Sequence, residues 1–374
     1  MRAPELVLIT GGAGFIGSHV ADALLAQGYA VRVLDNIDAQ VHGDTSRFPG
    51  YLASDVVTLR GDVRNPADVS RALDGVDAVF HFAAAVGVGQ SMYQIERYTD
   101  VNNRGTAVLL EGLLKRRVRK LVVASSMSVY GEGLYRSVDG ATRTPEPRSL
   151  QQLKRADWEI SDSNGHALVP VPTSEDKLVS PQSIYALSKL DQETMCLLFG
   201  RTYGVPAVAL RFFNVYGARQ ALANPYTGVL ANFAARYLNG RPPIIFEDGL
   251  QQRDFVHVRD LARACVLALE TDSAQDMALN IGSGNAYTIV EIAQRLARVL
   301  GREDIPPEIS GRYRAGDIRN CFADISRARE VLGYSPAIEL DTGLAELAEW
   351  LMQCESEDNG DTAVGELQAR GLVA

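Results

Sequence analysis

Cysteines, lysines and long apolar runs are scarce in this 374-residue sequence. The four cysteines (Cys196, Cys265, Cys321 and Cys354) lie at least 33 residues apart, so no metal-binding or redox pair is encoded locally. No apolar run reaches the length of about 18 residues that a membrane helix requires, and the N-terminus lacks a basic segment followed by an apolar one. We therefore expect a cytoplasmic protein with reduced thiols, no metal and no membrane partner.

Basic residues are outnumbered by acidic ones. The chain has 37 Lys and Arg, of which five are Lys, against 46 Asp and Glu, and its net charge is −9. A nucleic acid would meet a repulsive average field, so we expect no nucleic acid partner. The length favours two domains or one large domain with an added lobe, because single hydrophobic cores stop growing at about 250–300 residues.

Short apolar strands alternate with amphipathic helices through the first part of the chain. Strands are predicted at 6–9, 30–34, 57–59, 78–82 and 120–124, and helices at 18–27, after Pro66 and at 99–116. This alternation is typical of an α/β fold with a Rossmann-type, doubly wound parallel sheet. Between about 132 and 180 the alternation is interrupted by a Pro-, Ser-, Asp- and Arg-rich insertion, with Trp158 as its large apolar anchor.

The later segments resume the pattern. A helix is predicted at 185–203, a strand at 207–213, and helices at 229–239, 258–270 and 289–300. We divide the chain into a Rossmann domain at 1–210, which contains the insertion, and a smaller C-terminal α/β lobe at 211–354 that returns in part to the first domain. Residues 355–374 begin with an acidic stretch and are expected to form a flexible tail.

A glycine-rich turn follows the first predicted strand. Gly11, Gly14 and Gly17 open a helix there, so backbone N–H groups and the positive helix end converge where a pyrophosphate is the natural anion. Taken alone, the pattern could also be a purely structural turn. Asp35 ends the second strand 18 residues after Gly17. A carboxylate there binds the hydroxyls of an adenosine ribose and repels a 2′-phosphate, so the sequence favours NAD over NADP.

Two further strand ends fit a dinucleotide. Asp62 follows the third strand and could meet the adenine amino group, or it could serve only in a turn or a helix cap. The fourth strand ends at Phe82 and is followed by the small residues Ala83 and Ala84. Small side chains there could let a dinucleotide approach the backbone, or they could serve packing alone.

Candidate catalytic residues occur on one helix and at one strand end. Tyr185 and Lys189 are four residues apart and share a face of the predicted helix. An ammonium beside a phenol lowers a pKa that is ordinarily about 10, so Tyr185 could act as a base near neutrality. Tyr-x-x-x-Lys is a common coincidence on its own. Ser126 and Ser128, however, supply hydroxyls at the sheet edge where doubly wound folds bind ligands.

Together these features resemble the extended short-chain dehydrogenase/reductase family, specifically its nucleotide-sugar epimerases and dehydratases. The resemblance spans roughly residues 5–350, apart from the insertion. It is carried by an ordered series of matches at 10–17, 34–36, 61–64, 81–84, Asn102 with Gly105 and Thr106, 125–131, Tyr185 with Lys189, 210–214, 253–260 and 314–317.

The resemblance implies a role for each matching residue. Ser126 would hold the sugar hydroxyl, Tyr185 would remove its proton, and Lys189 would tune Tyr185 and bind the nicotinamide ribose. Further NAD contacts are implied for Phe15, Ile16, Asn36, Val63, Phe212 and Asn102, the last near the nicotinamide. Substrate contacts are implied for Ser128, for Asn214, Arg253 and Arg314 at the diphosphate, and for Phe246 at the nucleotide base. Alternatively, Arg253 could pair with Asp254 or Asp260, and Phe246 could be a strand-core aromatic.

The residues after Ser126 distinguish the reactions of the family. A 4,6-dehydratase carries Asp-Glu at the positions of Met127 and Ser128, and uronate decarboxylases carry Glu at Ser128. Neither side chain present here transfers protons at neutral pH. The resemblance therefore implies 4-epimerisation through a 4-keto-sugar with NAD regenerated in each cycle. Segments at 126–133, 169–173, 224–229 and 245–249 resemble the bacterial dTDP-L-rhamnose 4-epimerase group, which interconverts dTDP-L-rhamnose and dTDP-6-deoxy-L-talose.

Other readings of the same residues stay open. A UDP-sugar 4-epimerase acting on glucose, hexosamine or glucuronate, a nucleotide 4-ketosugar reductase and a non-catalytic nucleotide-binding protein share this fold. The partner is in each case a dTDP- or UDP-linked sugar or nucleotide. The resemblance also implies a homodimer through the helices near 102–117 and 185–203. Its apolar positions Val108, Leu109, Leu197 and Leu198 could equally belong to the core.

Overall fold

The fold is built on a twisted parallel sheet. The computed structural model describes residues 4–43, 45, 47–220, 228–314, 316–353 and 360–373. Seven strands lie in the order β14-β9-β5-β4-β1-β2-β3, all paired in parallel. This order confirms the doubly wound, Rossmann-type prediction. The strands span Leu6–Thr10 (β1), Ala30–Asp35 (β2), Val57–Arg60 (β3), Ala78–His81 (β4), Lys120–Ser126 (β5), Ala207–Phe212 (β9) and Met277–Ile281 (β14).

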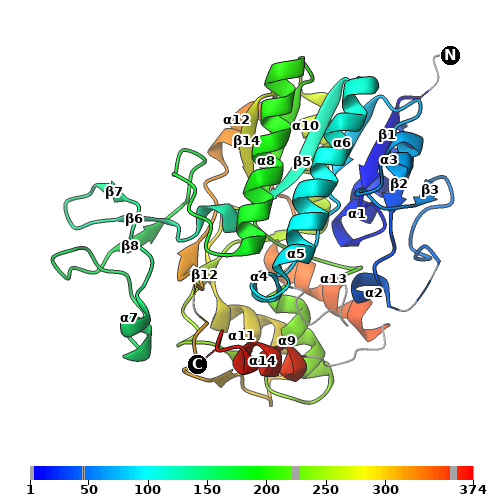
Figure 1. The fold of residues 1–374 in the computed structure, drawn as a ribbon. Helices are drawn as coiled ribbons and strands as arrows, with labels where there is room; N and C mark the ends of the chain where they lie inside the picture. Colours follow the sequence, from blue (N-terminus) through cyan, green and yellow to red (C-terminus); the bar gives the residue numbers. More distant parts are fainter. Residues whose placement is uncertain are drawn as a thin grey trace.

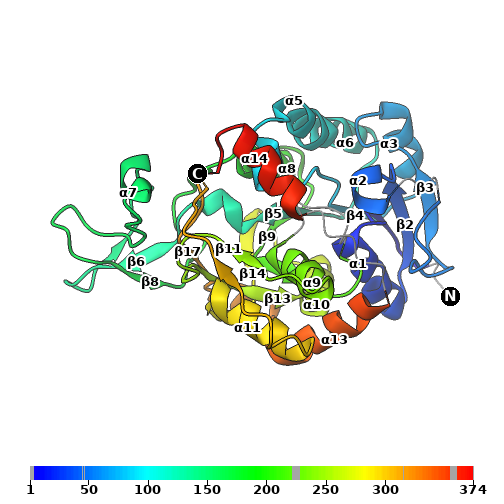
Figure 2. The ribbon, with the colours of Figure 1, turned by 90° about the horizontal axis from the view of Figure 1, so that it is seen from below.

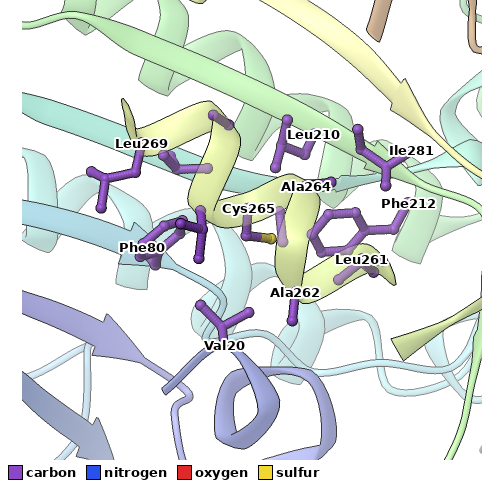
Figure 3. Close-up of a cluster of buried hydrophobic side chains, with 14 of the residues drawn as sticks. Val20, Phe80, Leu210, Phe212, Leu261, Ala262, Ala264, Cys265, Leu269 and Ile281 are labelled. Carbon is purple, nitrogen blue, oxygen red and sulfur yellow. The ribbon is translucent and has the colours of Figure 1, made fainter. Parts of the chain in front are cut away.

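Helices cover both faces of the sheet (Figure 1). On one face pack α1 (Phe15–Ala26), α10 (Val258–Glu270) and α12 (Ser326–Leu332), and on the other α3 (Pro66–Ala72), α6 (Gly105–Lys115) and α8 (Ile184–Tyr203). Because side chains alternate along a strand, Val122 joins the first core, whereas Leu121 and Val123 join the second. Figure 3 shows part of the first core, with Cys265 of α10 packed near Phe212 of β9.

The predicted helix at 99–116 is not uniform. It consists of α5 (Ile95–Tyr98), a π-helical segment η1 (Thr99–Arg104) and α6. A π-turn inserts an extra residue into the helix and shifts the side chains that follow, which is a common device near functional sites. Asn102, buried in η1, is the residue that this geometry turns inward.

A second layer of structure forms a smaller lobe at the carboxyl ends of the strands. Its core joins α9 (Val229–Leu238), α11 (Ile289–Val299) and α13 (Leu340–Met352). The lobe also has short strand pairings, which are β10 (Asn214–Tyr216) with β13 (Phe255–His257), β11 (Ile244–Ile245) with β16 (Glu308–Ile309), and β12 (Gln252–Arg253) with β15 (Tyr287–Thr288) and β17 (Asn320–Cys321). The chain returns from this lobe to the main sheet through α10 and β14.

The insertion at 132–180 projects from the side of the molecule (Figures 1 and 2). It contains α7 (Leu150–Lys154) and an antiparallel sheet of β6 (Leu134–Arg136), β7 (Thr142–Arg143) and β8 (Val169–Val171). Tyr135, Ile160 and Leu168 form its small core, so the expected anchor Trp158 is only one half-buried contributor, beside Tyr313. A buried ion pair between Arg148 and Glu247 ties the insertion to the lobe.

The tail differs from our expectation. Within the expected flexible tail at 355–374, the described part at 360–373 contains helix α14 (Gly360–Ala369), and Val373 forms an antiparallel bridge with Arg314. Residues 354–359 and 374 lie outside the described residues, as does Cys354. Cys196, Cys265 and Cys321 are buried free thiols.

Within the described residues no group of three His, Cys, Asp or Glu residues could hold a metal ion, and no helix is both long and apolar enough to cross a membrane.

Candidate functional site

A cavity of about 650 Å³ opens at the carboxyl ends of β1, β2, β4, β5 and β9. It runs from the glycine turn, past the strand ends and α8, to the smaller lobe. All of the predicted site residues line it except Asn102 and Phe246. The lining members are Gly11, Gly14, Phe15, Ile16, Gly17, Asp35, Asn36, Asp62, Val63, Phe82, Ala83, Ala84, Ser126, Ser128, Tyr185, Lys189, Phe212, Asn214, Arg253 and Arg314.

The glycine turn leaves room for a phosphate group against the backbone. Gly11 has a φ of +71°, and a Cβ there would lie 2.8 Å from the backbone nitrogen of Ala83, so only glycine fits. Helix α1 begins at Phe15 without a side-chain cap on its first N–H groups. Uncapped N–H groups at a helix N-terminus beside a cavity fit the diphosphate of a dinucleotide.

Asp35 lies at the tip of β2, buried beside this turn. Its Oδ2 accepts a hydrogen bond from Ala13 N at 3.0 Å and its Oδ1 accepts one from Ile37 N at 2.9 Å. Burial raises the pKa of this carboxyl group, while the two backbone donors oppose that rise. A carboxylate has acceptor capacity for about four hydrogen bonds, so Asp35 can still bind ribose hydroxyls.

Asp62 is held in an ion-pair network at the edge of the cavity. Both of its carboxylate oxygens accept hydrogen bonds from Arg64, at 2.9 and 2.7 Å, and Asn36 donates another at 3.3 Å. These Arg64 contacts lower the pKa of Asp62. Arg64 also pairs with Asp100 in η1, at 2.7 Å. The purely structural role that the sequence left open for Asp62 is therefore satisfied, and a contact to adenine stays a prediction.

The candidate catalytic residues meet at the end of β5. Ser126 Oγ accepts a hydrogen bond from Ser128 Oγ at 2.8 Å. Ser183 caps α8 by accepting from Ala186 N, which places Tyr185 in the first turn of the helix. Burial raises the pKa of Tyr185, and the hydrogen bond between its hydroxyl and Ser126 acts in the opposite direction. Tyr185 and Ser126 both line the same cavity.

Lys189 lies one turn further along α8. The residue is 3% exposed, and burial lowers its pKa from 10.5 to about 8, an effect that the nearby carboxylate of Glu193 opposes. Its Nζ donates a 2.7 Å hydrogen bond to Gln192 Oε1. The lowered pKa places the ammonium close to its titration at physiological pH.

Sequence reasoning missed the polar network beneath Lys189. Gln192 Nε2 donates to Thr106 Oγ1 at 2.9 Å. His81 is fully buried between Thr10 and Thr106, with ring nitrogens 2.8 and 2.9 Å from their hydroxyl oxygens. Burial lowers the pKa of His81 to about 3, so its ring is neutral. The available signal was the spacing of three residues from Lys189 to Gln192, which puts both on one helix face.

Asn102 is not among the cavity-lining residues, and its expected place near the nicotinamide stays a prediction. Its Oδ1 accepts from Ala85 N at 2.7 Å, and its Nδ2 donates to Ser188 Oγ at 2.8 Å. All its polar atoms are thereby used to join the loop after β4 to α8. Asn102 is a positioning residue for that loop.

Two arginines converge on one aspartate where the lobe meets the cavity. Arg314 pairs with Asp317 at 3.0 Å, and Arg253 lies 3.6 Å from the same carboxylate. Arg253 also donates to backbone carbonyls of Gln252 and Arg319 at 2.9 Å each. These two cations are therefore held at one point, as a diphosphate site requires.

The alternative partners considered for Arg253 are wrong. Asp254 accepts instead from Ser283, Gly284 and Ala323, while Asp260 accepts from backbone N–H groups and pairs with Arg263.

Phe246 does not line the cavity. Its ring lies under the guanidinium of Arg314, 4.8 Å from the ring centroid, and Arg312 lies 6.0 Å away. The residue is half-buried rather than part of a strand core. A contact with the nucleotide base would require the base to join this stack.

The catalytic end of the cavity contains few groups that can exchange protons. The carboxylates among the described lining residues are Asp35, Asp38, Asp62 and Asp317. The first three follow β2 and β3 at the end expected for adenosine, and Asp317 is paired with arginines. Beside Ser126 the lining residues Met127 and Ser128 offer no carboxylate.

Comparisons with known proteins agree with this geometry. The family model described as the NAD dependent epimerase/dehydratase family matches residues 7–152 and 163–282. The chain is 32% identical to dTDP-L-rhamnose 4-epimerase of Burkholderia thailandensis, over 93% of this chain and 95% of the relative. It is 31% identical to a putative UDP-glucose 4-epimerase of Methanocaldococcus jannaschii, over 92% and 98% of the two chains.

Solved structures show the same fold. UDP-glucose 4-epimerase of Thermotoga maritima, crystallised with UDP-glucose, matches with a TM-score of 0.75 and 30% identity, over 93% of this chain and 99% of that one. UDP-glucuronic acid 4-epimerase of Bacillus cereus, in complex with UDP-glucuronic acid and NAD, matches with a TM-score of 0.74 and 29% identity, also over 93% and 99%.

Proposed function

The chain belongs to the NAD dependent epimerase/dehydratase family, and within it we propose a 4-epimerase that interconverts dTDP-L-rhamnose and dTDP-6-deoxy-L-talose. Its relatives and structural neighbours are NAD-dependent nucleotide-sugar epimerases, and NAD is its cofactor. The observation that carries the proposed reaction is the catalytic end of the cavity, which Ser126, Tyr185 and Lys189 line and where the described lining residues beside them include no carboxylate. Elimination and decarboxylation each need an additional proton-transferring group there, whereas epimerisation does not.

The residues divide the work of the reaction. Ser126, which lines the cavity together with Tyr185, would orient the C4 hydroxyl of the sugar. Tyr185 would take the proton of that hydroxyl, and the ammonium of Lys189, one helical turn further along α8, would stabilise the phenolate against the burial that raises the pKa of Tyr185. The chemistry that bound NAD supplies is acceptance of a hydride from C4 and its later return. Tyr185 then gives the proton back to the oxygen of the epimer.

Inversion requires the 4-keto-sugar to present its opposite face. Arg253 and Arg314 would hold the diphosphate through charge-assisted hydrogen bonds while the ring turns about its phosphate link. In the described structure the carboxylate of Asp317 forms ion pairs with both arginines. Substrate binding would therefore replace this carboxylate with phosphate oxygens as the partner of the arginines.

The cofactor end has its own set of residues. The glycine turn and the N-terminus of α1 would hold the diphosphate of NAD, Asp35 the adenosine ribose, and Lys189 the nicotinamide ribose. Phe82, Ala83 and Phe212 also line the part of the cavity proposed to hold NAD.

Fewer observations support the identity of the sugar and of the nucleotide base than support the reaction. The identity to the Burkholderia enzyme and the apolar residues Val86, Val88, Met92 and Met127 along the cavity favour a 6-deoxysugar, whose C6 is a methyl group. The second candidate is a UDP-sugar 4-epimerase, because UDP-sugar epimerases match this chain at nearly the same identity. A 4-ketosugar reductase would instead consume one reduced nicotinamide in each turnover.

We also propose a homodimer and a cytoplasmic location. Leu114 on α6 and Leu187, Leu198 and Tyr203 on α8 are about half exposed, which supports packing of these two helices against a second copy. Leu109 belongs instead to the core. The buried free thiols of Cys196, Cys265 and Cys321 support a reducing compartment.

A substrate panel tests the proposed function. Purified protein is incubated with dTDP-L-rhamnose, dTDP-glucose, UDP-glucose, UDP-N-acetylglucosamine and UDP-glucuronate without a reductant, and products are identified by NMR. We expect C4 epimers from dTDP-L-rhamnose and little from the UDP-sugars. Selective turnover of a UDP-sugar would replace the substrate, and reduction of a 4-keto-sugar by NADH without any epimerisation would refute the reaction.

A further inference from the structure

The C-terminal segment closes one side of the cavity. Leu367 of α14 and Leu372 just beyond it are among the cavity-lining residues, although they lie 49 and 54 residues beyond Ile318, the lining residue that precedes them in the sequence. Figures 1 and 2 show α14 in red, at the lower end of the molecule in the view of Figure 1. No sequence motif of the site includes these leucines.

The end of α14 has a local geometry that brings the two leucines together. Gly371 has a φ of +68°, and its N–H donates to the carbonyl oxygen of Gln368 at 2.9 Å. The N–H of Leu372 donates to the carbonyl oxygen of Leu367, also at 2.9 Å. This pair of bonds is the Schellman arrangement, in which the side chains at these two positions commonly pack on each other. The sequence of the segment thus encodes an apolar corner.

Side chains fasten this corner to the loop that follows β4. Tyr93 Oη donates a 2.7 Å hydrogen bond to Glu366 Oε2, and the Arg370 guanidinium lies 4.0 Å from the Tyr93 ring centroid. Leu367 packs directly on the backbone of Gly89 in α4 (Val88–Ser91), where a Cβ would come within 3.0 Å of it. The C-terminal segment therefore packs at a defined site formed by Gly89 and Tyr93, which we call its seat.

The seat lies on the catalytic side of the cavity. Gln90, next to Gly89, accepts a hydrogen bond from Tyr98 Oη at 3.1 Å. The Tyr98 ring in turn packs edge-on against Tyr185, with centroids 6.4 Å apart. At the other end, Val373 bridges to Arg314, one of the two arginines assigned to the diphosphate. The apolar corner thus stands between the proposed base and the proposed phosphate site, where the sugar must lie.

We propose that Leu367 and Leu372 bind the sugar and help to select a 6-deoxy substrate. This inference rests on the proposed function, because it concerns the same cavity and the same substrate. With Val86, Val88 and Met92, the two leucines make the wall predominantly apolar. A methyl group at C6 gains contact with such a wall, whereas a hydroxymethyl group loses water without finding a hydrogen-bond partner. The corner also shields the 4-keto-sugar from solvent while it turns.

Binding measurements on the full-length protein test this role. NAD-loaded protein is titrated calorimetrically with dTDP-L-rhamnose and with dTDP, which lacks the sugar. Leu367→Ser and Leu372→Ser are expected to weaken dTDP-L-rhamnose binding about tenfold, the scale of one lost apolar contact in a pocket. Binding of dTDP should stay within about twofold of that of the unsubstituted protein, because the nucleotide lies outside the corner. Tyr93→Phe, which removes the hydroxyl bonded to Glu366, should shift the affinity in the same direction by less.

A matched control lies on the same helix. Gln368 is exposed, and Gln368→Ser should leave both affinities unchanged. Equal binding of the sugar nucleotide by the leucine variants and the unsubstituted protein would overturn the inference. Tighter binding by those variants would also overturn it, since α14 would then obstruct the site. If the unsubstituted protein binds dTDP-L-rhamnose no better than dTDP, the proposed sugar fails instead. The leucine variants are then titrated with the UDP-sugar that the protein epimerises. Unchanged affinity for that UDP-sugar would show that Leu367 and Leu372 do not bind the sugar.

Discussion

Gln192 offers a graded test of how the site controls proton transfer. Its Oε1 accepts a 2.7 Å hydrogen bond from the buried ammonium of Lys189, so it stabilises the charged form of that lysine. Gln192→Leu removes this acceptor. A hydrogen bond to a charged group contributes about 1.5–3 kcal/mol. Since one pKa unit corresponds to about 1.4 kcal/mol, the pKa of Lys189 should fall by about one to two units.

The sign of this shift fixes the expected pH dependence. Lys189 starts from a pKa of about 8, so its ammonium is largely intact at pH 6 and half lost at pH 8. A further fall leaves at most about a tenth of the ammonium at pH 8 but about half or more at pH 6. We therefore expect Gln192→Leu to lower kcat at pH 8 by about five- to fiftyfold and at pH 6 by about twofold or less. The alkaline limb of the kcat profile moves to lower pH.

Gln192→Glu is the matched variant for this measurement. It also loses the amide that donates to Thr106, but it places a carboxylate beside the ammonium and should move the alkaline limb to higher pH. Profiles of kcat between pH 5.5 and 9.5 for the three proteins provide the comparison. If both variants lose the same factor at every pH, Gln192 acts through packing and the account of Lys189 is wrong.

Three other substitutions have clear expected outcomes. Tyr185→Phe should reduce kcat by about 10²–10⁴-fold, the usual contribution of a general base, while calorimetric NAD affinity changes little; retained turnover would exclude Tyr185 as the base. Gly11→Ala should abolish or strongly weaken NAD binding, because its Cβ would lie 2.8 Å from Ala83 N; unaltered NAD affinity would show that the glycine turn does not hold the diphosphate of NAD. Glu247→Gln should lower the free energy of unfolding by about 3–5 kcal/mol in urea titrations, because it leaves the buried Arg148 without its carboxylate and removes one of the carboxylates around Arg319; a loss below about 1 kcal/mol would show that the pair of Arg148 with Glu247 is dispensable.

The parts that the sequence predicted well are those with local signals. The strands of the main sheet are short apolar runs, and the glycine turn and Asp35 stand at fixed places relative to them. Tyr185 and Lys189 needed only a helical period to be placed on one face. Parallel sheets bring the carboxyl ends of their strands to one edge, so residues at those ends could be assembled without knowing any tertiary contact.

The sequence was least informative for residues whose interaction partners are set by tertiary contacts. Arg253 and Asp254 are adjacent in sequence, yet successive side chains of an extended segment point to opposite sides, so they do not pair. Asn102 was expected near the nicotinamide, and the sequence did not reveal that its side chain, in a π-helical segment, bonds to Ala85 and Ser188. Its helical period alone does not reveal this extra residue in the turn.

The C-terminal segment was misjudged because its acidic start dominates its composition. Charge and small residues at 355–361 favoured disorder. The informative feature is further on, where Leu367, Gly371 and Leu372 have the spacing of a helix end closed by a glycine. Such a signal predicts a helix end, but its seat against Gly89 and Tyr93 depends on contacts between residues some 270 positions apart.

The central claim, transient oxidation at C4 with return of the same hydride, is tested most directly by isotope retention. The protein is incubated with its nucleotide sugar in D₂O, without added cofactor or reductant, until both C4 epimers are present, and C4 of the product is examined by ¹H NMR. The account predicts that the product keeps protium at C4, because Tyr185 exchanges only the hydroxyl proton and the hydride never mixes with solvent. Deuterium at C4 would contradict it, since the epimer would then arise by deprotonation of carbon.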